Sequence, residues 1–211
     1  MTSEGRSAHC LGRSSCRLAV LAPALAAISV GSAEAHEIVP GVTGFASLLL
    51  HPFVAVETAL LMLGLALVVG SMGRRPPLAL GMGVLLVGTS AGVLLQPSAI
   101  LVPGLWRLPL ILALILGTTA AIGRPVPRPI VIALALLVAT AVGIAVPPER
   151  PGLVGRAEVV AAVVSAILVT QLAIAVPRAV LSHFRPVQLG GQILGAWILA
   201  ISLLGMTIWF R

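Results

Sequence analysis

Long apolar runs, separated by short stretches rich in Pro, Gly and Arg, dominate the chain after residue 50. Each run has roughly 16–20 residues, which is near the length that an α-helix needs to cross about 30 Å of hydrocarbon. In lipid the backbone N–H and C=O groups must form hydrogen bonds within the protein, which leaves helices or closed barrels. These runs lack the alternation of polar and apolar residues that is typical of barrel strands. The pattern predicts an all-α membrane protein with a bundle of about six transmembrane helices, at about 53–70, 78–95, 107–122, 130–146, 157–176 and 192–210.

Two local patterns refine this picture. Pro52 is suited to the first turn of a helix, so Val42 to Leu50 is interpreted as a short separate piece that leads into the first span. Small residues recur four positions apart within two runs, which places them on one helix face and favours close helix packing. These pairs are Gly88 with Gly92 and Gly191 with Gly195.

The N-terminus has the layout of a secretory signal peptide over residues 1–35. Three arginines precede the apolar run Leu18–Val30, and small residues follow at Ala33 and Ala35. Cleavage after Ala35 leaves His36 as the first residue of a single six-helix domain, 36–211. The alternative is an uncleaved first helix, although the run is short for a membrane span.

Composition supports a membrane protein and excludes a nucleic-acid partner. Only 9% of the 211 residues are charged and the mean hydropathy is +1.14, whereas a soluble domain carries roughly 25% charged residues. All 13 basic residues are Arg and all six acidic residues are Glu, for a net charge of +7. The arginines lie at the ends of apolar runs instead of clustering on one face, as topology signals do.

The distribution of these arginines predicts an orientation. Loops after the first, third and fifth spans carry six of them, and the opposite side carries four, so the former loops are expected in the cytoplasm. The first group is Arg74, Arg75, Arg124, Arg128, Arg178 and Arg185, and the second is Arg107, Arg150, Arg156 and Arg211. The chain is therefore predicted to be a multi-pass protein of the inner (plasma) membrane with both mature termini outside.

Few residues offer chemistry. The two cysteines, Cys10 and Cys16, lie in the presequence, so thiolate chemistry is not expected in the mature chain. No phosphate-binding glycine loop, nucleophile elbow, zinc-protease helix or paired-cysteine motif is present. The chain is interpreted as a non-enzyme without a permanently bound cofactor.

His51 and Glu57 are ionisable residues in or beside the first span. Such residues are costly in a bilayer and usually face a cavity or a partner. On an unbroken helix, residues six positions apart point about 120° away from each other, so His51 and Glu57 would share a face only if Pro52 reorients the chain. Thr58, seven residues after His51, lies on the same helix face as His51. The alternatives are an interfacial histidine beside a helix-starting proline, and a protonated Glu57 carboxyl that is hydrogen-bonded inside the bundle.

His36 and Glu37 stand at the predicted mature N-terminus. A free α-amine and the imidazole of the same residue can chelate a divalent metal, since both offer neutral nitrogen near pH 7. The alternative is an ordinary exposed start of the mature chain. His183 is interpreted as a solvated loop residue, and the polar Gln171, Thr170 and Ser165 of the fifth span as interhelical hydrogen-bonding groups.

The first span resembles the signature region of the HupE/UreJ family of nickel and cobalt permeases. The matching residues are Gly44, Phe45, His51, Pro52 and Met62, with Glu57 where the family has Asp. The segment "RPVQLGGQILGAWILAISLLG" is similar to the closing helix of that family. Ala55 stands where the signature has Gly and Thr58 where it has a second His, and the later His-rich family motif has no counterpart.

The resemblance implies a secondary permease for a divalent transition metal, nickel or cobalt, with the ion as substrate. His36 and Glu37 would capture the ion outside, and His51 and Glu57 would pass it into the bundle. The second hypothesis is a non-transporting accessory or assembly protein for a metalloenzyme or a membrane complex. The partners expected are the divalent ion, the lipid bilayer, and either further copies of the chain or a metalloenzyme maturation protein.

Overall fold

The computed structural model describes residues 42–72, 78–101 and 108–209, all of which belong to one compact unit, Ile38–Arg211. Within these ranges the chain is helical and contains no strand. The predicted signal peptide, 1–35, and the candidate ligands His36 and Glu37 lie outside the described residues. The elements are α2 (Phe45–Val54), α3 (Val56–Gly70), α4 (Leu78–Leu101), α5 (Leu108–Ile122), α6 (Arg128–Ala145), α7 (Gly152–Thr170), the π-helix η2 (Gln171–Ala175), α8 (Val176–Val180) and α9 (Arg185–Trp209).

Each of the six predicted apolar runs forms a helix, but only some are long enough to count as spans. Three helical stretches of the described chain are long and apolar enough to cross a membrane: Arg128–Ala145, Gly152–Val180 and Arg185–Ile208. The bent pair α2 and α3 makes a fourth if it is one broken span. Leu108–Ile122 is apolar but shorter, as is the segment Gly81–Gln96 within the 24-residue α4. The all-helical class is confirmed, with three to four candidate spans.

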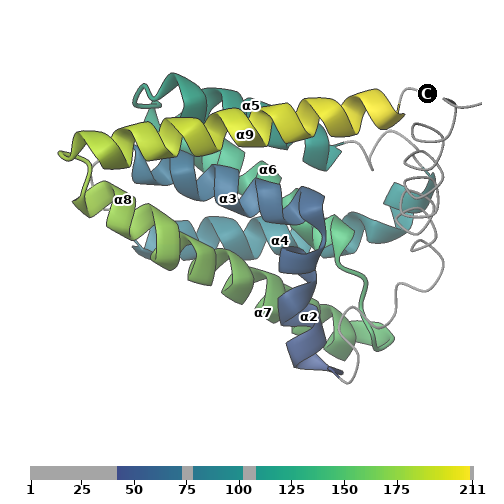
Figure 1. The fold of residues 1–211 in the computed structure, drawn as a ribbon. Coiled ribbons are helices and arrows are strands. Elements are labelled where there is room, and N and C mark those ends of the chain that lie inside the picture. The colour runs from purple at the N-terminus through teal and green to yellow at the C-terminus, as the bar shows by residue number, and fades with distance from the viewer. Residues whose placement is uncertain (1–41, 73–77, 102–107, 210–211) are drawn as a thin grey trace, which may run out of the picture. The chain divides into compact units, whose positions relative to one another are not determined.

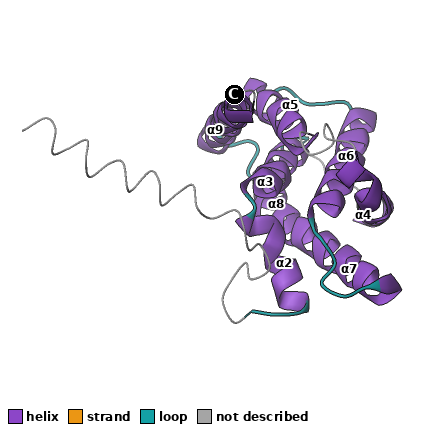
Figure 2. Cartoon of the chain, turned by 90° about the vertical axis from the view of Figure 1, so that its right-hand side faces the viewer, coloured by secondary structure: helices purple, strands orange, loops and turns teal. Residues whose placement is uncertain are grey.

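Helix α3 is the centre of this helical unit. Ten of its fifteen residues are buried, among them Leu61, Met62 and Leu65. It packs against α2, α5, α6, α7, η2, α8 and α9, and in the end-on view of Figure 2 these helices surround it. A helix that is apolar all round is expected in such a buried position.

The predicted small-residue faces are sites of close helix contact. A Cβ atom added to Gly88 or Gly92 of α4 would lie within 3 Å of the α6 backbone oxygens of Leu136 and Thr140, respectively. Since both pairs advance in the same direction along the chain, α4 and α6 run parallel, side by side (Figure 1). The Gln96 amide, in the C-terminal part of α4, donates to the Gly143 carbonyl at 3.0 Å and to the Ile144 carbonyl at 3.3 Å, so it satisfies carbonyls that the end of α6 leaves unpaired.

Helix α5 packs in the same manner on α9. A Cβ atom on Gly195 would lie 2.5 Å from the Ala121 nitrogen, and one on Gly117 would lie 2.7 Å from the Leu199 nitrogen. Farther along, Gly205 faces Leu110. The order of these contacts makes α5 and α9 antiparallel, as Figure 1 shows.

The helix boundary predicted at Pro52 is wrong. Pro52 lies inside α2, and the break falls three residues later at Ala55, which is extended with φ −73° and ψ 112°. The ring and the missing N–H of proline affect the turn that precedes it, so Pro52 does not itself end α2, and the chain changes direction at the extended Ala55. The axes of α2 and α3 consequently differ by 78°.

Candidate functional site

The α2–α3 break is held by the side chain of Thr58. Its buried hydroxyl donates to the Pro52 carbonyl at 2.8 Å and lies 2.9 Å from the Ala55 carbonyl. The break removes the regular helical partner of the Pro52 carbonyl, and the hydroxyl replaces it. Thr58 therefore has a structural role at this point of the first span.

His51 and Glu57 lie on opposite sides of the break and differ in burial. His51 is half-buried in the last turn of α2, and its Nδ1 atom is buried without a hydrogen-bond partner in the described structure. The side chain of Glu57 is exposed in the first turn of α3, where a negative charge is favourable to the helix dipole. The interpretation of Glu57 as a carboxyl hydrogen-bonded inside the bundle is therefore wrong.

No metal-ligand cluster is assembled in the described part of the chain. Groups of three or more His, Cys, Asp and Glu side chains that could hold an ion do not occur among these residues. His183 is exposed beside Phe184, as predicted for a loop histidine. His51 is thus the described candidate ligand with a buried nitrogen, and Glu57 presents its carboxylate at the surface.

The candidate span Gly152–Val180 carries a π-helix that begins at Gln171, next to Thr170. Thr170 donates to the Ala166 carbonyl of its own helix at 2.9 Å, and both polar atoms of the Gln171 amide are buried without a partner among the described residues. Thr170 and Gln171 therefore form no hydrogen bond to another helix among the described residues, contrary to the prediction from the sequence. The wider π turn re-aims side chains at this position, and such turns recur at functional sites.

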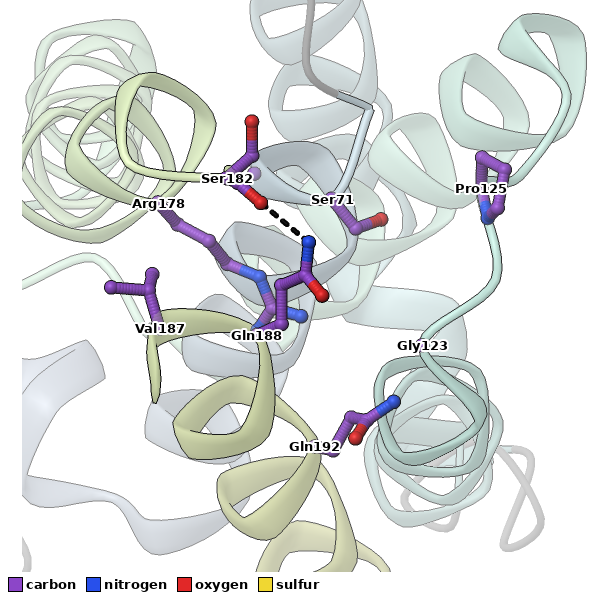
Figure 3. A pocket seen from close by; sticks show the side chains of 9 residues that line it. Ser71, Gly123, Pro125, Arg178, Ser182, Val187, Gln188 and Gln192 are labelled. Carbon is purple, nitrogen blue, oxygen red and sulfur yellow. Dashed lines mark hydrogen bonds between the residues drawn. The ribbon is translucent and has the colours of Figure 1, made fainter. Parts of the chain in front are cut away.

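A pocket lies at the end of the unit opposite the α2–α3 break. Its volume is about 240 Å³, and it lies between the end of α3, the α5–α6 loop, α8 and the first turns of α9 (Figure 3). The lining combines small, polar and apolar residues with one charged group. The residues are Gly70, Ser71, Gly123, Pro125, Arg178, Ser182, Val187, Gln188 and Gln192.

Arg178 is the charged residue of this pocket. From α8 its side chain reaches toward the centre of the pocket, as Figure 3 shows. Only 8% of the residue is exposed, and its Nη1 atom is buried without a hydrogen-bond partner in the described structure. The sequence had indicated a loop arginine that marks topology, whereas the residue lies in a helix and is buried.

Some of the residues that line this pocket stand out in the sequence. Arg178 directly follows a long apolar run, and Gln188 and Gln192 are four residues apart on one face of the closing helix. The Gln188 amide donates to the Ser182 backbone carbonyl, which ties the start of α9 to the preceding turn (Figure 3). That these groups meet at one cavity depends on the packing of α3, α8 and α9, which the linear pattern does not specify.

Comparisons with protein-family models, with curated proteins and with solved structures found no match.

Proposed function

We propose that the chain is a multi-pass inner-membrane permease for a divalent transition metal ion, nickel or cobalt. The observation that carries the proposal is the broken first span, with its 78° bend at Ala55 and the buried His51 Nδ1 one turn before it. Many secondary transporters bind substrate at such discontinuous helices. The resemblance of this region to the HupE/UreJ signature supports the same substrate class.

The proposal assigns different roles to the two ionisable residues. A buried imidazole nitrogen without a protein partner is available to a metal ion, and imidazole is a good ligand for nickel and cobalt. The exposed carboxylate of Glu57 would attract the cation at the surface before it reaches the break. His36 and Glu37 are proposed to capture the ion outside the membrane.

The test is the nickel and cobalt content of whole cells, measured by mass spectrometry at matched membrane levels of each variant. The wild type should raise one of the two metals above the empty-vector control. His51→Ala should return the content to the control value because it removes the buried ligand, and Glu57→Gln should reduce it partially.

His183→Ala is the matched control, because this histidine is exposed and lies near the opposite end of the unit; it should behave as the wild type. Equal metal content in the wild type and His51→Ala would contradict the proposal, as would a wild type that raises neither metal.

A second candidate is a non-transporting accessory or assembly protein. It is favoured by the absence, among the described residues, of any group of three or more metal-ligating side chains. This candidate predicts that neither metal accumulates and that a protein partner is purified together with the chain from native membranes after mild crosslinking. A wild type that accumulates metal without such a partner would contradict it.

A further inference from the structure

The Arg178 pocket contains a buried cation whose counter-charge is absent from the described residues. A buried charge is costly unless an opposite charge and hydrogen bonds compensate it. The described carboxylates all lie elsewhere. Glu57 is in the first turn of α3, whereas Arg178 packs on Gly70 at the end of that helix, which places about 20 Å of helix between them.

The remaining described carboxylates belong to the opposite end. Glu158 pairs with Arg150 at 2.9 Å, and Glu149 accepts a hydrogen bond from the Gly44 nitrogen at 3.0 Å. Glu158 lies 20 residues before Arg178 on the continuous helical stretch Gly152–Val180, a distance of about 30 Å. Neither carboxylate can compensate the guanidinium.

The neighbouring helices leave space for the guanidinium. A Cβ atom on Gly191 of α9 would lie almost on its Nη1 atom, and a Cβ atom on Gly70 of α3 would lie 2.9 Å from the Arg178 Cβ. A glycine on each side therefore lets the side chain pass between α3 and α9 into the pocket. Ser182 supplies a hydroxyl, and Gln188 and Gln192 supply amides, around the same cavity. The Ser71 hydroxyl also lines it but already donates to the Val68 carbonyl at 2.7 Å.

We propose that this pocket binds a phosphate-bearing anion, with the Arg178 guanidinium as the charged donor and the Ser182 hydroxyl and the glutamine amides as neutral donors. Guanidinium groups bind phosphate oxygens through paired hydrogen bonds, which are stronger than bonds between neutral groups. A pocket of about 240 Å³ with polar groups in its lining has room for a phosphate group with some of its hydration. The bound anion supplies the counter-charge.

Two sources offer this chemistry, the phosphate of an anionic lipid headgroup and free inorganic phosphate. Basic pockets between membrane helices are known to hold lipid headgroups, and Arg178 lies at the end of a candidate span.

The experiment has one arm for each source. In neutral detergent, inorganic phosphate is titrated into the purified full chain by calorimetry. In mixed micelles, retained phosphatidylglycerol is counted by native mass spectrometry against phosphatidylcholine.

The variants separate the pocket from general charge. Arg178→Gln should lower the affinity at least about tenfold, because it removes the charge-assisted bonds. Arg185→Gln, an exposed arginine at the start of α9 that does not line the pocket, should change the affinity by less than about twofold.

A second pair of variants remains informative if Arg178→Gln does not fold. Gln188 is exposed at the rim of the pocket. Gln188→Glu introduces a carboxylate that competes with the anion and should lower the affinity about tenfold, whereas Gln188→Leu removes the same amide without charge and should lower it by about threefold or less.

The outcomes separate the sources. Saturable phosphate binding that depends on Arg178 supports a site for free anions, and Arg178-dependent retention of phosphatidylglycerol alone supports a lipid site. The proposal is overturned if the wild type binds neither ligand, if Arg178→Gln and Arg185→Gln lose binding equally, or if Gln188→Glu and Gln188→Leu are equivalent.

Discussion

Thr58 is the residue on which the shape of the broken span depends. Its hydroxyl is the hydrogen-bond partner that the described structure gives to the Pro52 carbonyl, and the side chain is only 1% exposed. A buried carbonyl that loses its partner costs about 1–3 kcal/mol. The residue that stands where the HupE/UreJ signature has a histidine therefore stabilises the backbone here.

Thr58→Val should lower the free energy of unfolding by about 1–3 kcal/mol, because valine matches the shape of threonine and leaves the Pro52 carbonyl unpaired. Thermal unfolding of the purified chain in one detergent measures the effect. Thr119→Val is the control, since the Thr119 hydroxyl bonds the Ile115 carbonyl of its own helix at 2.6 Å, a carbonyl in the middle of a regular α-helix. Equal midpoints for Thr58→Val and the wild type would contradict the structural role.

Arg178 and Gln171 mark the limit of sequence reasoning at the residue scale. Charge and position along the chain predict an arginine at a segment end, but not whether neighbours leave room for its side chain. That room comes from Gly70, which lies far from Arg178 in sequence, and from Gly191 on the next helix. Similarly, the polarity of Gln171 was evident, whereas the π turn that buries its amide was not.

At the scale of helices, glycine pairs decide which neighbours approach closely. The spacing of Gly88 and Gly92 predicted a close contact, and that contact is made with α6. The sequence did not identify the partner helix, because many apolar faces of the chain are chemically alike. The opposing backbone at Thr140 and Gly143 decides it, since the added atom at Gly92 would lie 3.0 Å from the Gly143 Cα.

Gly92→Ala should lower the stability of the chain by about 1–3 kcal/mol, because the new methyl group must push α4 and α6 apart. Gly83→Ala, in the same helix with nothing within 4 Å of the added atom, should have no effect or stabilise by up to about 1 kcal/mol through helix propensity. The unfolding midpoint of Gly92→Ala should therefore be clearly lower than that of Gly83→Ala. The contact would be refuted if Gly92→Ala were as stable as Gly83→Ala.

At the scale of the whole molecule, the apolar runs and their helical nature were predictable, and the count of spans was less so. Helix α5 (Leu108–Ile122) has 15 residues and is shorter than a typical span, whereas α4 (Leu78–Leu101) has 24 residues. The proposed topology of six crossings requires both to cross. It also places the Arg178 pocket on the cytoplasmic side.

This topology predicts a pattern of cysteine labelling in a Cys10→Ser, Cys16→Ser background. Leu153→Cys, at a position that is 82% exposed, should react with a membrane-impermeant maleimide in intact spheroplasts. Gly73→Cys, Val126→Cys and His183→Cys should react only after the membrane is opened. Reaction of Val126→Cys and Gly73→Cys from opposite sides would mean that α4 and α5 do not both cross.

The pairing of α5 with α9 has a consequence for biogenesis. Between these two helices the ribosome must synthesise α6, α7, η2 and α8, so the glycine face of α5 has no permanent neighbour while the intervening helices are made. A nascent chain that stalls before α9 would present Gly117 and Ala120 of α5 without their partner, and membrane quality-control proteases would meet a chain that is inserted but incompletely assembled. The contact between α5 and α9 can therefore form only after α9 has been synthesised, which makes it a late step in the folding of this chain.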